Sequence, residues 1–100
     1  MRVKKFILGS HTINVKYVKD VIDPDTGEKI LGLCNPLTNT IHVATYFKGE
    51  KLAEAVVNHS LHHELTHYIL SLLGEQELNN NETFVDMVGG YIHQYVKTKK

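Results

Sequence analysis

The sequence lacks several features that would place a protein in a particular class. A single cysteine, Cys34, excludes any disulfide bond within the chain. Lysine plus arginine and aspartate plus glutamate balance at 11 each, so no charge excess attracts nucleic acid or an anionic membrane. No apolar run approaches the length that spans a bilayer. The first residues, MRVKKFILG, contain too few consecutive apolar residues for the core of a secretory signal. We therefore expect a cytoplasmic protein with no nucleic-acid or membrane partner.

The N-terminal half has the alternating pattern of β-strands. The chain of 100 residues suffices for a single domain spanning residues 1–100. "TINVKYV" places Ile13, Val15 and Tyr17 on one face, and "TIHVATYF" places Ile41 and Val43 on one face. A short apolar strand, "KILGLC", lies between them, and the turn signals "DPDTG" and "NPLTN" separate the three. This pattern predicts an antiparallel meander of about three strands.

The C-terminal half has helical periodicity. From about Gly49 apolar residues recur at three- and four-residue spacing, without proline, as far as Gly74, a common helix stop. After the polar link "EQELNNN", a second helix is predicted from about Glu82 towards Val96, with Asn80 or Asn81 as its cap. The predicted fold class is therefore α+β, with a small antiparallel N-terminal sheet of about three strands packed on two C-terminal helices.

The second predicted helix contains the pair Gly89-Gly90. Each glycine costs roughly 1 kcal/mol in a helix interior, so the pair either breaks the helix or permits close packing. We favour close packing of bare backbone against a neighbouring element.

The segment "HELTH", from His63 to His67, carries the chemistry. On a helix these two imidazoles lie on one face, about 6 Å apart along the axis, so both can reach one ion. Zinc accepts imidazole nitrogen readily. Glu64 lies on the flank of that face, where it can take a proton from a water that the metal acidifies. The spacing is that of the HExxH zinc motif.

A zinc site of this type requires a third protein ligand and outer partners for the ligands. The segment "NETFVD" offers Glu82 and Asp86, four residues apart and hence on one face of the second helix. Glu82 can be the third ligand. Asp86 can accept the remaining N–H of a liganding histidine and so fix its orientation.

Together, "HELTH" and "NETFVD" resemble the two motifs of the gluzincin metallopeptidases, the thermolysin-like group, whose second motif is NExxxD. The resemblance implies zinc ligation by His63, His67 and Glu82. It implies Glu64 as general base and Asp86 as the partner of His63. It also implies a zincin-like fold and a peptide or protein substrate. The spacer of 14 residues between His67 and Glu82 is short for thermolysin-like enzymes, and the chain looks more like the single-domain minigluzincins.

The resemblance also suggests a substrate site. In zincins the strand before the active-site helix usually forms the upper rim of the cleft, and the corresponding segment here is Thr40 to Thr45. Its free backbone groups would pair with an extended peptide. The sequence thus predicts a zinc-dependent hydrolase; the alternative is a zincin-fold metal-binding or regulatory module with little turnover.

Other residues admit competing interpretations. His59 can form a rival metal pair with His63, although no glutamate follows it. Cys34 invites comparison with peptide deformylases, which use HExxH and a cysteine ligand, but "LGLCNP" lacks their motif, and a small buried residue is the simpler interpretation. His62 is interpreted as a partly exposed helix residue. His93 lies on the same helix face as Glu82 but about 16 Å along the axis, too far for a direct catalytic role.

Overall fold

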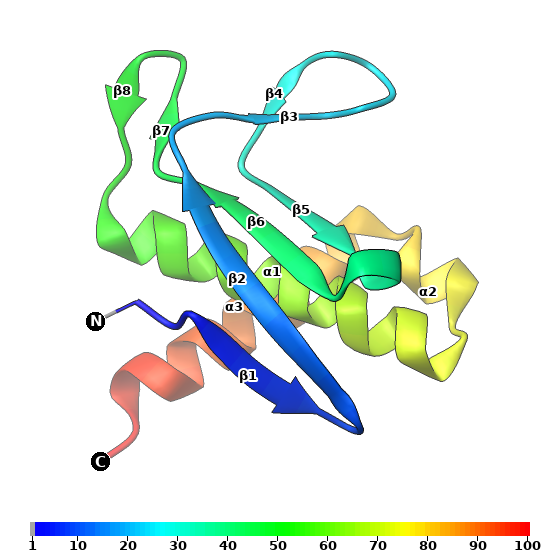
Figure 1. The fold of residues 1–100 in the computed structure, drawn as a ribbon. Helices are drawn as coiled ribbons and strands as arrows, with labels where there is room; N and C mark the ends of the chain where they lie inside the picture. The colour runs from blue at the N-terminus through cyan, green and yellow to red at the C-terminus, as the bar shows by residue number, and fades with distance from the viewer. Residues whose placement is uncertain (1) are drawn as a thin grey trace.

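A four-stranded sheet occupies one side of the molecule (Figure 1). A computed structural model describes residues 2–100 of the chain. The central pair is parallel and both outer pairs are antiparallel. In spatial order the strands are β1 (Lys5–Leu8), β2 (His11–Val18), β6 (Thr40–Ala44) and β5 (Gly32–Asn35).

The prediction of a three-stranded antiparallel meander is therefore wrong in detail, although the α+β class is confirmed. The sheet has a fourth strand, β1, and a parallel pair, β2 with β6. The reason lies in the long segment between β2 and β6. It first forms the hairpin of β3 (Val21–Ile22) and β4 (Lys29–Ile30), and then β5 returns along the outer side of β6. The strand β6, buried at four of its five residues, thereby occupies an interior position in the sheet.

The first long helix begins later than its pattern predicts. Residues near Gly49 form a second small hairpin, with β7 (Tyr46–Phe47) and β8 (Glu50–Lys51) joined by a turn in which Lys48 and Gly49 have positive φ. The helix α1 then runs from Glu54 to Leu73 and ends, as predicted, at Gly74 in the left-handed conformation.

Three further helical segments complete the fold: η1 (Pro36–Thr38), α2 (Gln76–Asn79) and α3 (Glu82–Thr98). Of the two predicted caps of α3, Asn80 and Asn81, it is Asn81 that caps the helix, because its Oδ1 accepts a hydrogen bond of 3.0 Å from the backbone N–H of Phe84. None of the helices in residues 2–100 has the length and apolarity to cross a membrane.

The hydrophobic core lies between the sheet and α1. Ile13 and Val15 of β2 and Ile41 and Val43 of β6 are buried on one face of the sheet, as the alternation predicts. Their partners on α1 are three buried side chains, Val57, Leu61 and Tyr68. The core thus fixes α1 against the sheet and holds the HELTH segment in place.

The helix α3 packs mainly against α1. The closest approach is at Gly89, where an added Cβ would lie 2.9 Å from both the Cα and the backbone nitrogen of His63. No side chain fits in that space, so the glycine allows the two backbones to meet. The interpretation of Gly89 as a close-packing residue is confirmed, and α3 is brought to the level of the histidines of α1.

Candidate metal centre

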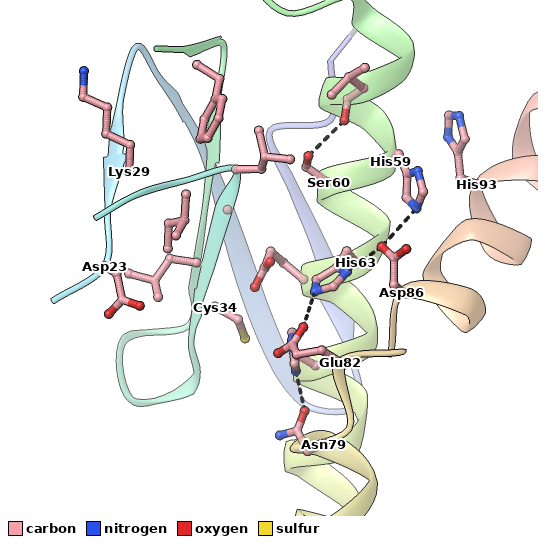
Figure 2. Close-up of a pocket in the computed structure, with 18 of the residues that line it drawn as sticks. Asp23, Lys29, Cys34, His59, Ser60, His63, Asn79, Glu82, Asp86 and His93 are labelled. Carbon is pink, nitrogen blue, oxygen red and sulfur yellow. Dashed lines mark hydrogen bonds and ion pairs between the residues drawn. The ribbon is translucent and has the colours of Figure 1, made fainter. Parts of the chain in front are cut away.

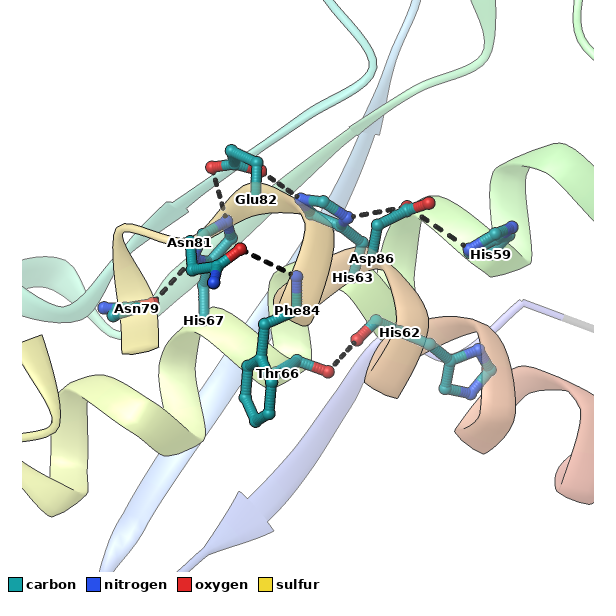
Figure 3. A network of polar contacts seen from close by, with 10 residues as sticks. All are labelled: His59, His62, His63, Thr66, His67, Asn79, Asn81, Glu82, Phe84 and Asp86. Atoms are coloured by element: carbon teal, nitrogen blue, oxygen red, sulfur yellow. Dashed lines mark hydrogen bonds and ion pairs between the residues drawn. The ribbon is translucent and has the colours of Figure 1, made fainter. Parts of the chain in front are cut away.

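Three side chains from two helices converge at one point. His63 and His67 come from successive turns of α1, and Glu82 is the first residue of α3. The Nε2 atom of His63 lies 3.1 Å from Oε2 of Glu82, and Nε2 of His67 lies 3.2 Å from Oε1. One ligand atom from each residue falls within 4.8 Å of the others, and this is the only such group among residues 2–100. Figure 3 shows Glu82 bridging the two rings.

The second nitrogen of each ring has its own acceptor. Nδ1 of His63 lies 3.1 Å from Oδ1 of Asp86, and Nδ1 of His67 lies 2.6 Å from Oδ1 of Asn79 (Figure 3). Both oxygens are acceptors, so each Nδ1 carries the proton and donates it. Each Nε2 is left with a lone pair directed at Glu82. This is the tautomer that a metal-binding histidine requires.

The donor set fits a zinc ion. Two lone-pair nitrogens face a carboxylate at 3.1 and 3.2 Å, and such a pair of acceptors requires a positive charge between them. Zinc binds nitrogen and oxygen at about 2.0–2.2 Å, so two ligands of a tetrahedral ion lie roughly 3.3–3.5 Å apart. The separations found here approach that value. A small tightening around an ion, rather than a rearrangement, would complete three protein ligands.

Glu64 lies beside this group, and neither ring is hydrogen-bonded or ion-paired to it. Its side chain is buried, with 7% of the residue exposed. The pKa of Glu64 is raised to about 7, chiefly by burial; the nearby His67 opposes the rise and the negative charge of Glu82 adds to it. A carboxyl group in this range can both take up and release a proton near neutral pH.

The place of Glu64 depends on a glycine of the neighbouring strand. An added Cβ at Gly32 of β5 would lie 2.9 Å from Cγ and 3.1 Å from Oε2 of Glu64. Real Cβ atoms do not approach other atoms this closely, so any side chain at Gly32 would displace the carboxylate. The bare backbone of β5 thus forms the wall against which Glu64 rests.

A cleft of about 1040 Å³ opens in front of the group. Its walls come from β5, with Gly32 and Cys34, and from α1 and α3, with His63, Glu82 and Asp86 (Figure 2). The size is that of sites that accept a small organic ligand or a few peptide residues. The convergent polar groups described above all face this one opening.

The predicted rim strand, Thr40 to Thr45, does not border the cleft with a free edge. β6 is paired with β2 on one side and β5 on the other. β5 is the edge strand of the sheet and is the one that faces the site. The prediction named the wrong strand because β6 is the last strand of the four-stranded sheet before the helix in the sequence, whereas β5 folds back along the outer side of β6 and forms the edge.

The structure also bears on the competing interpretations of His59 and Cys34. His59 does not share an ion position with Nε2 of His63; its Nε2 lies 3.5 Å from Oδ1 of Asp86, which binds the opposite nitrogen of His63. Cys34 lines the cleft but is not part of the group whose ligand atoms lie within 4.8 Å. It is half-buried and packs against the hydrophobic core, so the interpretation as a small buried residue is met only in part.

Two residues of the site, Asn79 and Gly32, are not among those that the motifs predict. Asn79 belongs to the polar link and lies 12 residues after His67, the histidine that it contacts. A run of three asparagines before a helix start is a usable sign, because one can cap and another remains free. Gly32 has no local sign at all, since its partner Glu64 is brought near only by tertiary packing.

No protein-family model, curated protein or solved structure matches this chain.

Proposed function

We propose that the chain is a zinc-dependent hydrolase, a small metallopeptidase of gluzincin type acting on a peptide or protein substrate. The observation that carries the proposal is the convergence of His63, His67 and Glu82, within 4.8 Å, beside the buried carboxylate of Glu64. Three protein ligands leave a coordination position open, which is typical of catalytic rather than structural zinc.

The residues of the chain have distinct parts in the proposed reaction. His63, His67 and Glu82 would hold the ion, with Asp86 and Asn79 fixing the two rings. Zinc, when bound, acidifies a water molecule and polarises the carbonyl of the scissile bond. Glu64 takes the proton from that water and transfers it to the leaving amine. The wall of β5 keeps Glu64 beside the cleft during both transfers.

The arrangement of the elements also supports the proposal. A sheet precedes a helix with HELTH, and a second helix with the glutamate follows, as in the minimal zincin-like core that the motifs resemble. The cleft has an edge strand along one side, β5, whose outer backbone groups can pair with an extended peptide. A peptide bond presented in this way would pass in front of Glu64.

The test combines metal content with hydrolysis. Protein purified without a metal-affinity tag is analysed for metal and incubated with a mixed peptide library, with and without a chelator. The parent should contain zinc and cleave peptides, and Glu64→Gln should retain zinc and lose cleavage. His63→Ala and Glu82→Ala should lose the zinc held at this centre together with cleavage, whereas His11→Ala, at the start of β2, should lose neither.

Two outcomes would contradict the proposal. If Glu64→Gln cleaves peptides as fast as the parent, Glu64 is not the base. If the parent retains zinc but cleaves no peptide in the library, the alternative of a metal-binding or regulatory module is correct.

A further inference from the structure

A second group of imidazoles lies further along the same two helices and has no part in the proposed reaction. His59 and His62 come from α1 and His93 comes from α3. The ring centres of His59 and His93 are 5.7 Å apart, and those of His62 and His93 are 5.4 Å apart. Figure 2 shows His59 and His93 facing each other across the space between the helices.

The ring centres are about as far apart as those of rings that share an ion, although the planes of His59 and His93 are stacked at 5° and those of His62 and His93 are tilted by 44°. Two imidazoles bound to one tetrahedral zinc have ring centres roughly 5 Å apart, given a bond of about 2.0–2.1 Å to each nitrogen. His63 and His67, which belong to the group described above, have ring centres 5.0 Å apart. The second trio is therefore only slightly wider than the first pair.

Two nitrogens of the trio are buried without a hydrogen-bond partner. They are Nε2 of His59 and Nδ1 of His62. Buried polar atoms are ordinarily paired, and an orphaned imidazole nitrogen is a ready ligand atom. His93 is suited in another way: burial, and then the neighbouring His59 and Lys97, lower the pKa of His93. A lowered pKa keeps the ring neutral, the form that binds a metal.

A carboxylate beside the trio adds to its attraction for a cation. Oδ1 of Asp86 lies 3.5 Å from Nε2 of His59, so a negative charge sits at the edge of the group. Lys97 acts in the opposite direction, being close enough to influence His93. The nitrogens of the trio converge less tightly than the ligand atoms of His63, His67 and Glu82. The rings must therefore turn to meet an ion, which makes this the weaker of the two groups.

We propose that His59, His62 and His93 form a second site for a divalent ion of the imidazole-preferring class, with Zn²⁺, Ni²⁺ and Cu²⁺ as its members. The ligand chemistry is distinct from that of the first group, because all three protein ligands are imidazoles. The ion would join α1 to α3 one turn or more away from Glu82. This site is independent of the proposed function and stands whether or not the chain is a hydrolase.

The test counts zinc ions by equilibrium dialysis and elemental analysis on tag-free protein stripped of metal beforehand. The parent should bind two equivalents, one more weakly. His93→Gln should bind one, and His11→Gln, which removes a histidine at the start of β2, should still bind two. The double variant His67→Ala/Glu82→Ala lacks the first group and should still bind one equivalent, which adding His93→Gln should abolish.

The outcomes separate the two sites. A His93→Gln variant that binds as many equivalents as the parent, or a His67→Ala/Glu82→Ala variant that binds none, overturns the second site. Failure of the first group alone appears differently, as no change in stoichiometry between the parent and His67→Ala/Glu82→Ala. If circular dichroism finds His93→Gln unfolded, His62→Gln replaces it, because its half-exposed ring tolerates the change.

Discussion

Oδ1 of Asp86 lies 3.1 Å from Nδ1 of His63, on the side of the ring away from Glu82. The carboxylate therefore fixes the proton of His63 at Nδ1 and directs the lone pair of Nε2 towards the proposed ion. A partner of this kind contributes to affinity without touching the metal.

Asp86→Ala should weaken zinc binding by roughly tenfold to a hundredfold, because His63 loses the acceptor that sets its tautomer and orientation. Asp86→Asn should weaken it less, since an amide oxygen can still accept the proton. Competition with a chelator of known affinity measures both effects. Glu77→Ala, an exposed acid in α2, is the control and should bind zinc as the parent does. Parental affinity in Asp86→Ala would show that the contact is incidental.

Gly89→Ala should destabilise the protein by about 1–3 kcal/mol, because the new methyl group would lie 2.9 Å from the backbone of His63 and force the helices apart. Gly90→Ala is a matched control. Its Cβ would meet the ring of His59 at 3.5 Å, an ordinary contact, and the helix gains up to about 1 kcal/mol in propensity. Chemical denaturation measures the free energy of unfolding of each. Equal stabilities for the two variants would contradict the close approach at Gly89.

Gly32→Ala should reduce hydrolysis by roughly tenfold to a hundredfold while zinc content is unchanged, because the methyl group displaces the carboxylate of Glu64. The loss should fall mainly on kcat. Leu37→Ala alters an almost fully exposed residue of η1 that does not line the cleft, and should have little effect. A Gly32→Ala variant with parental kcat would mean that Glu64 does not need this wall.

Cys34 should be unreactive in the native protein. Burial, with a smaller contribution from the charge of Glu64, raises the pKa of its thiol from 9.0 to about 12. The rise of 3 in pKa lowers the thiolate fraction at pH 8 roughly a thousandfold, and only the thiolate is alkylated. Alkylation by iodoacetamide, followed by mass spectrometry, should therefore be slow in buffer and fast in urea. Equal rates in the two conditions would indicate that the thiol is exposed.

Local sequence pattern predicts the features of this structure that depend on residues close together in the chain. Alternation identifies the buried faces of Ile13 and Val15, and the helix stop at Gly74 follows from the conformational freedom of glycine. The placement of His63 and His67 on one face follows from helix periodicity alone. Such features need no knowledge of the rest of the fold.

The parts that pattern does not predict depend on which segments meet. The parallel pairing of β2 with β6 arises because the chain makes a hairpin and a return strand between them, which alternation does not encode. The hairpin at Lys48 and Gly49 directly precedes the helical pattern, so periodicity alone does not separate the two and predicts the helix too early. The wall at Gly32 exists only after β5 and α1 have packed together.

The packing of α3 mainly on α1 has a consequence for the order in which the protein opens. The core is shared by the sheet and α1, so α3 can separate from α1 while that core stays intact. With two of the proposed ligands on α1 and one on α3, metal release and detachment of the outer helix would become a single event. Amide hydrogens of α3 should then exchange with solvent faster than those of β6 when zinc is withdrawn.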